Sequence, residues 1–217
     1  MSEELLRQRD YWNREITQFE AIYSHKKSSL SAWLDRMFRR DMYDRFVYTL
    51  KNTEPVADHT VLDVGCGTGR YIMALMQRGC PHATGIDISE QMIGHCRAQA
   101  QAGGFSDKTE FIRTDLLDYT PPRVFDVCIG IGLFDYITDP LPVLRKMRDC
   151  TGVRLIASFP RKWTWRAPIR KARLALRGCN VRFFTRAQVR DLLTAAGFKS
   201  ISLSTVGKLF CVTASVR

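Results

Sequence analysis

Short apolar runs alternate with amphipathic segments after residue 60. The runs are rich in Val and Ile, and the segments between them carry apolar residues at helical spacing. The runs cover 60–64, 82–88, 109–115, 124–132 and 152–159, and helices are expected from Gly69, from Ser89 and over 140–147. This alternation predicts a parallel, doubly wound sheet with helices on both faces.

The last part of the chain follows a different pattern. Thr185 and Gln188 have the spacing of a capping box at the start of a helix, and Gly197 marks the end of that helix. An antiparallel hairpin is predicted after it, with strands over 198–205 and 208–216 and a turn at Val206 and Gly207. The complete pattern predicts an α/β fold: a Rossmann-like, mostly parallel sheet of seven strands, the last strand antiparallel.

The first part of the chain shows no strand pattern. Aromatic and apolar residues recur at helical spacing, including Trp12, Ile16 and Phe19, and again Trp33 and Met37. Two or three helices are therefore expected before Pro55. We predict a helical cap or lid over residues 1–55 and a core domain over residues 56–217.

Amino-acid composition says more about the cellular location of the protein than about its function. No apolar run in the 217 residues approaches the roughly 20 residues of a spanning helix, and the polar N-terminus is unlike a secretory signal, so a cytoplasmic protein is expected. The seven cysteines form no CxxC pair, which argues against a disulfide framework or a zinc site. The net charge of +11 favours an anionic partner without choosing its class.

The stretch VLDVGCGTGRYI, residues 61–72, joins a predicted strand to a predicted helix through Gly65, Gly67 and Gly69. Such loops often hold phosphate groups, because backbone N–H groups and the helix N-terminus attract anions. Asp63 argues against that interpretation here, since a carboxylate beside a pyrophosphate would be repelled by about 3–4 kcal/mol at an effective dielectric constant near 20. The loop therefore favours a cationic ligand.

Two further carboxylates end the next two predicted strands. Asp87 follows Gly69 by 18 residues, close to the spacing at which a carboxylate binds the hydroxyl groups of a ribose. Asp115 ends the following strand, where it could accept the exocyclic amine of adenine. A nucleoside with positive charge fits this set, and S-adenosylmethionine, with its sulfonium and ammonium groups, is such a molecule.

The motifs VLDVGCGTG, GIDIS with Met92, Thr114-Asp115 and FDVCIGIGLFDYI together resemble those of the class I S-adenosylmethionine-dependent methyltransferases. The resemblance covers roughly residues 56–217. It implies that the loop around Cys66 surrounds the methionine end of the cofactor and that Asp87 binds its ribose. The other implied cofactor contacts are Asp63, Gly65, Gly67, Gly69, Ile88, Met92, Asp115, Leu116 and Gly130. From the residues alone, Ile88 and Met92 could equally be core residues, and Asp115 a turn or cap.

A fainter resemblance connects the ends of the chain to the magnesium-protoporphyrin O-methyltransferases. Its features are Ile22-Tyr23, the arginine-bearing stretch RRDMYDRF and Ser158-Phe159 followed by an aromatic and basic segment. In that family a tyrosine of the N-terminal cap and a histidine-tyrosine pair after the fourth strand border the methyl group. Tyr23 and Tyr136 match these places, and Asp135 stands where the family has histidine. The cap residues expected at the cofactor are Tyr23, Arg40 and Arg45.

Methyl transfer from a sulfonium needs alignment, exclusion of water and, for a protonated acceptor, a base. No metal is required. The candidate catalytic residues are Asp135, Tyr136 and Tyr23, with His25 as a weaker candidate. Each has a structural alternative: Asp135 as a helix N-cap, Tyr136 as a packed aromatic residue and His25 as a surface group.

The stretch over residues 161–186 interleaves arginines and lysines with aromatic residues. It could form the rim of a pocket for an anionic substrate, and we assign Arg161, Trp163, Trp165 and Arg166 to substrate binding on that basis. It could also touch acidic lipid as an amphipathic helix, contact nucleic acid, or be a solvated helix face.

A small-molecule methyltransferase acting on an anionic acceptor is therefore the leading hypothesis. An RNA or protein methyltransferase is the alternative, as is a protein that uses S-adenosylmethionine without methyl transfer. Peripheral membrane contact and the oligomeric state are left open.

Overall fold

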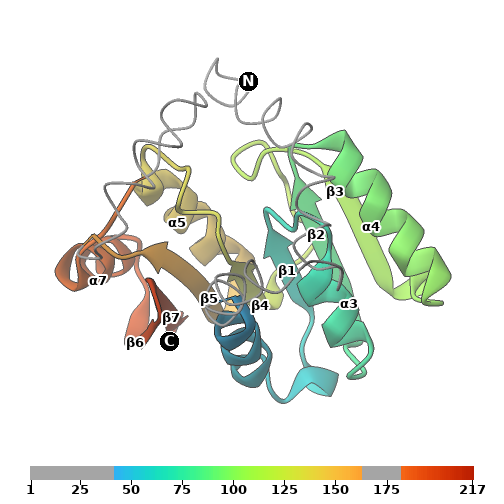
Figure 1. Cartoon of the computed structure of the whole chain (residues 1–217), viewed down its shortest axis with the longest axis horizontal. Helices are drawn as coiled ribbons and strands as arrows, with labels where there is room; N and C mark the ends of the chain where they lie inside the picture. The colour runs from blue at the N-terminus through green and yellow to red at the C-terminus, as the bar shows by residue number, and fades with distance from the viewer. Residues whose placement is uncertain (1–41, 163–181) are drawn as a thin grey trace, which may run out of the picture.

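The computed structural model describes residues 42–162 and 182–217 (Figure 1). A helix over residues 42–52 precedes a 3-10 turn, η1 (Val56–Asp58), and a second 3-10 turn is η2 (Ser106–Lys108). The strands are β1 (Val61–Val64), β2 (Ala83–Asp87), β3 (Thr109–Arg113), β4 (Phe125–Gly130), β5 (Thr151–Pro160), β6 (Lys199–Val206) and β7 (Leu209–Ser215). The labelled helices are α3 (Arg70–Met76), α4 (Glu90–Ala102), α5 (Pro140–Cys150) and α7 (Arg186–Ala195).

The strands form one sheet in the order β3-β2-β1-β4-β5-β7-β6. The first five strands in sequence pair in parallel, and β7 pairs antiparallel with both β5 and β6. The predicted fold class is therefore confirmed. The hairpin turn lies at Gly207 and Lys208, one residue later than predicted, and Gly207 has a φ of 53° that suits glycine.

Helices cover both faces of this sheet, as the alternation of its buried side chains requires. In β4, Val127 and Ile129 belong to one buried cluster, whereas Cys128 between them belongs to the other. The cluster that contains Val127 and Ile129 packs α3, α4 and the helix over 42–52 onto one face of the sheet. The cluster that contains Cys128 packs α5 and α7 onto the other face. Figure 1 shows α3 and α4 toward the β2 and β3 end and α5 and α7 toward the β5 to β7 end.

Side-chain caps start three of the helices. The Ser89 hydroxyl accepts a hydrogen bond from the Met92 N–H at the start of α4, and Thr185 and Gln188 form the predicted capping box of α7. The N-cap of α5 is Asp139, whose carboxylate accepts from the Leu141 N–H. The alternative interpretation of Asp135 as a helix N-cap is therefore wrong, because the N-cap of the helix lies four residues after it.

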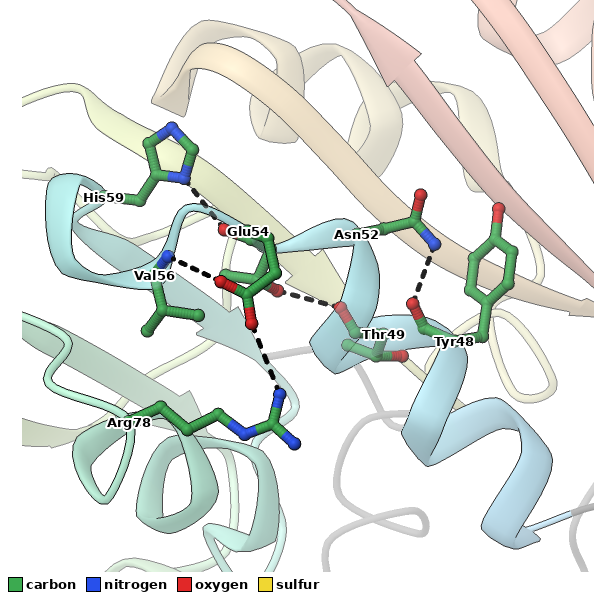
Figure 2. Close-up of polar contacts among 8 residues, drawn as sticks. Tyr48, Thr49, Asn52, Glu54, Val56, His59 and Arg78 are labelled. Carbon is green, nitrogen blue, oxygen red and sulfur yellow. Dashed lines mark hydrogen bonds and ion pairs between the residues drawn. The ribbon is translucent and has the colours of Figure 1, made fainter.

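Figure 2 shows polar contacts at the end of the helix over 42–52 and in the turn that follows it. The Asn52 side chain donates to the Tyr48 carbonyl, and the Glu54 carboxylate accepts from the Val56 N–H and meets Arg78 at 3.4 Å. Across the sheet face, the Arg154 guanidinium of β5 donates to the Asn52 carbonyl. The predicted boundary near Pro55 falls just after this helix, and the division into a cap and a core stays a prediction.

The predicted helices before residue 42 lie outside the described residues. So do Tyr23, His25, Arg40, Trp163, Trp165 and Arg166.

Candidate cofactor and acceptor site

The glycine loop leaves the carboxyl end of β1 at the centre of the sheet. Gly65, Gly67 and Gly69 have φ values of 68°, 53° and 74°, a left-handed conformation that side chains with a Cβ rarely adopt. The N–H groups of Gly65 and Cys66 both donate to the Ile86 carbonyl, at 2.8 and 3.1 Å, which ties the loop to β2. A Cβ on Gly67 would meet no atom within 4 Å, so the loop borders open space there.

Asp63 is buried directly behind this loop. Its side chain is 1% exposed, and its Oδ2 atom has no hydrogen-bond partner among the described residues. Burial, and secondarily the negative charge of Asp87, raise the pKa of the Asp63 carboxyl to about 7. A buried carboxylate without a partner is costly, so the site fits a ligand that supplies a positive charge or a hydrogen-bond donor.

Asp87 connects the loop to the start of α4. Its Oδ2 atom accepts from the Gly67 N–H at 3.0 Å, and its Oδ1 atom accepts from the Ser89 N–H at 2.9 Å. Burial raises the pKa of the Asp87 carboxyl, and the backbone hydrogen bonds partly offset this effect. A carboxylate oxygen can accept more than one hydrogen bond, so Asp87 can shape the loop and still bind hydroxyl groups.

The residues predicted for the adenine follow β2 and β3. Met92 and Leu116 are buried, whereas Ile88 and Asp115 are half-buried. The Asp115 Oδ1 atom accepts from the Leu117 N–H at 2.7 Å, so Asp115 does form a turn cap. Its other oxygen is not used in that hydrogen bond, and the adenine contact stays a prediction.

Gly130 ends β4, on the other side of the switch point. A Cβ on Gly130 would come within 2.8 Å of the Met147 Cε atom, so close packing against α5 already explains the glycine. Its predicted contact with the cofactor is an additional role that stays untested.

Arg45 is brought to this part of the site by the helix over 42–52. Its guanidinium lies 3.7 Å from where a Cβ on Gly132 would stand, just after β4, and its charge lowers the pKa of Cys211 against the larger effect of burial. The neighbouring Phe46 packs against α3, with the Arg70 guanidinium 4.1 Å from its ring centre. The helix therefore spans from the end of the glycine loop to β7.

The predicted catalytic residues follow β4. Asp135 is 5% exposed, Tyr136 is half-buried, and the Asp135 carbonyl accepts from the Arg182 N–H at 2.9 Å. Beneath them, Phe134 stacks on Phe159 with ring centres 4.4 Å apart, and Phe159 meets Phe184 edge to face. This aromatic stack holds the loop after β4 against the end of β5.

Arg161 follows β5 and points toward the β6–β7 hairpin. Its guanidinium donates to the Gly207 carbonyl at 2.9 Å and lies 5.5 Å from the centre of the Phe210 ring. Substrate binding by Arg161 stays a prediction, and the structure adds a role in fastening the hairpin turn.

Sequence reasoning missed Cys96 on α4. Its thiol donates to the Gly67 carbonyl at 3.1 Å, and contact with Cys96, together with burial, raises the pKa of the Cys66 thiol well above its usual value. The helical spacing that buries Cys96 was visible in the sequence, but its contact with the loop was not. Within residues 42–162 and 182–217, no three His, Cys, Asp or Glu side chains are placed to hold a metal ion.

The order of the strands, with the last strand antiparallel, is that of the class I S-adenosylmethionine-dependent methyltransferase fold. Residues 61–152, less than half of the chain, match the family described as Methyltransferase domain. No helix in the described ranges is both long and apolar enough to cross a membrane.

Relatives of known function match part of the chain. It is 28% identical to the tRNA U34 carboxymethyltransferase of Tolumonas auensis, over 54% of this chain and 35% of that protein. It is 34% identical to the ubiquinone biosynthesis O-methyltransferase of Neisseria meningitidis serogroup C, over 39% of this chain and 36% of that protein. The matches thus span little more than a third of the relatives' length.

Among solved structures, the magnesium protoporphyrin IX methyltransferase of Synechocystis PCC 6803 with bound SAH is similar at a TM-score of 0.77. The match covers 96% of this chain and 98% of that chain at 22% identity. At this identity the likeness concerns the fold.

Proposed function

We propose that the protein transfers the methyl group of S-adenosylmethionine to an oxygen or nitrogen atom of a small anionic acceptor, without a metal ion. The observation that carries this proposal is Asp63, which is 1% exposed and has an oxygen atom without a partner in the described part of the chain. A ligand with a cationic amine or sulfonium would offset the cost of burying that carboxylate. S-adenosylmethionine has both groups.

The surrounding residues suit the other parts of the cofactor. Asp87 stands at the end of β2 with acceptor capacity for ribose hydroxyl groups, and the buried Met92 offers an apolar surface for adenine. Arg45 supplies a positive charge suited to the cofactor's carboxylate. The open space beside Gly67 leaves room for close approach to the loop backbone.

The bound cofactor would supply a methyl group that is already activated by its sulfonium. The chain has to align the acceptor in line with that methyl group, exclude water and take up a proton when the acceptor carries one. Asp135 and Tyr136 are the candidate bases among the described residues, because both lie in the loop after β4 at the carboxyl edge of the sheet. The Phe134 and Phe159 stack below them can hold this loop in position.

Calorimetry and product analysis test the proposal together. Purified protein should bind S-adenosylmethionine and S-adenosylhomocysteine but not NAD, whose pyrophosphate would face Asp63. With isotope-labelled cofactor and a cell extract, mass spectrometry should find labelled methyl groups on a small acidic metabolite. Equal binding of NAD would contradict the cofactor assignment.

An RNA acceptor is the second candidate, because a relative matched over half of this chain is named as a tRNA carboxymethyltransferase. That match does not extend to most of the relative's length, so it supports a shared cofactor domain more than a shared acceptor. Label recovered in the RNA fraction of the same extract would favour this candidate. Cofactor binding with no labelled product in any fraction would favour a protein that uses S-adenosylmethionine without methyl transfer.

A further inference from the structure

Arg161 and Arg186 contact the β6–β7 hairpin, and Arg182, which lies between them in the chain, contacts the loop after β4. Arg161 follows β5, Arg182 precedes α7, and Arg186 is the first residue of α7. A short parallel bridge between Arg161 and Phe184 brings the first two segments together, with the Lys162 N–H donating to the Phe184 carbonyl at 2.9 Å. We call Arg161, Arg182 and Arg186 the hairpin arginines.

Aromatic rings and carbonyl groups hold these guanidiniums in place. Arg161 and Arg186 each lie 5.5 Å from the centre of the Phe210 ring, so their separation is at most twice that distance. Arg182 lies 5.3 Å from the centre of the Phe184 ring and donates to the Thr138 carbonyl. Arg161 and Arg186 are thus held at the hairpin, and Arg182 beside the loop after β4, before any ligand arrives.

No carboxylate balances this charge within the described ranges. Arg161 donates to the Gly207 carbonyl, Arg182 to the Thr138 carbonyl, and Arg186 to the Leu203 carbonyl and the Thr205 hydroxyl. A guanidinium has five N–H donors, so each arginine keeps donors beyond those in use. Paired N–H donors of this kind match the two oxygens of a carboxylate or phosphate group.

Arg186 also stands where a helix disfavours positive charge. It opens α7, whose first turn contains no acidic residue, although the helix dipole favours acids at an N-terminus. An arginine at this place, close to a second arginine on the same ring, is electrostatically unfavourable in the free protein. An anionic ligand would relieve both repulsions.

Arg182 adjoins the predicted catalytic loop, and Arg161 and Arg186 lie at the nearby hairpin. The Arg182 N–H donates to the Asp135 carbonyl at 2.9 Å, and the hairpin turn lies at the same edge of the sheet as the carboxyl ends of β4 and β5. We propose that the hairpin arginines bind a carboxylate or phosphate group of the small acceptor and so orient its reacting atom toward the site. This inference rests on the proposed function and adds the group by which the acceptor is recognised.

Isothermal titration of the full chain saturated with S-adenosylhomocysteine tests the inference, with citrate and inorganic pyrophosphate as probes. Arg186→Gln should weaken binding of the preferred probe by about tenfold, and Arg186→Lys should restore part of it, because the charge remains and the paired donors are lost. Arg190→Gln is the matched control: it removes the same charge one helical turn along α7 from an exposed residue outside the cluster. It should change binding less than twofold.

Arg161→Lys and Arg182→Gln should each weaken the same probe, with the unfolding temperature measured for every variant. Preference for citrate identifies a carboxylate and preference for pyrophosphate a phosphate. Equal losses in Arg186→Gln and Arg190→Gln would overturn the inference, as would no binding of either probe at about 10 mM, where even weak sites fill. Binding of single-stranded oligouridylate alone, with a salt slope that falls by about one unit per arginine removed, would also overturn it in favour of RNA.

Failure of the proposed function has a separate signature. Without binding of S-adenosylhomocysteine the cofactor assignment fails, whatever the probes do. The Arg186 and Arg190 variants should all retain wild-type affinity for S-adenosylhomocysteine, because neither residue belongs to the cofactor site.

Discussion

Replacing Asp63 by Asn should make the free protein more stable and its cofactor binding weaker. Asp63 is fully buried, and its carboxyl pKa is raised from 3.8 to about 7 by burial and by Asp87. Because the folded state holds the proton more tightly than the unfolded state, folding is penalised as the pH rises above 3.8, and the penalty is complete above about 7. Full ionisation then costs about 4 kcal/mol, from 1.36 kcal/mol for each pKa unit.

The penalty should therefore disappear in Asp63→Asn, which has a similar shape and no charge. The stability advantage of the variant should grow by about 2 kcal/mol between pH 5.5 and pH 8, the part of the titration that falls in this interval. Urea unfolding of both proteins at the two pH values measures this change in the stability advantage. The contributions of the other titrating groups cancel, because they are the same in both proteins. Calorimetry at pH 8 should show weaker binding of S-adenosylmethionine by the variant.

A stability difference that is the same at both pH values would refute the reasoning, because it would mean that Asp63 does not titrate in this interval. A loss of stability at pH 8 would show that the Asp63 charge already has a favourable partner in the free protein. In the wild type, cofactor binding near pH 6 should release a proton, and affinity should rise with pH and level off above about 7, as the Asp63 carboxyl becomes ionised in the free protein. Calorimetry in buffers of different ionisation enthalpy detects that proton.

Three further predictions concern Asp87, the glycine loop and the N-cap of α7. Asp87→Ala should weaken S-adenosylmethionine binding by about 1.5–3 kcal/mol, the scale of hydrogen bonds to a charged group, and unchanged affinity in calorimetry would remove Asp87 from the site. Gly69→Ala should lower the unfolding temperature more than Gly67→Ala does. A Cβ on Gly69 would stand 2.8 Å from the Cys96 Sγ atom, whereas a Cβ on Gly67 would face open space. Equal losses of stability would mean that the left-handed φ is the whole cost of both substitutions. Thr185→Ala should lower the free energy of unfolding by about 1 kcal/mol through loss of the α7 cap, with cofactor affinity unchanged, and a change in affinity would contradict that purely structural role.

Local sequence patterns determined most of the sheet and its connections. Alternating apolar runs predicted the strands, the capping box at Thr185 predicted the start of α7, and the glycines after Asp63 predicted the loop. Each of these features depends on residues close together in the chain, so a single sequence contains the information. The sequence also predicted that Asp63 and Asp87 lie at the same edge of the sheet, because parallel strands have their carboxyl ends at one edge.

Only the tertiary structure decided which distant residues meet there. Asp87 receives the Gly67 N–H and thereby shapes the loop as well as facing the predicted ribose, a contact between two segments 20 residues apart. Arg161 and Arg186 share the Phe210 ring because β7 lies between β5 and β6, an order that the hydrophobic pattern of the strands does not specify. Patterning determines which face of an element is buried, whereas the partners of a side chain follow from how the elements pack across the sheet.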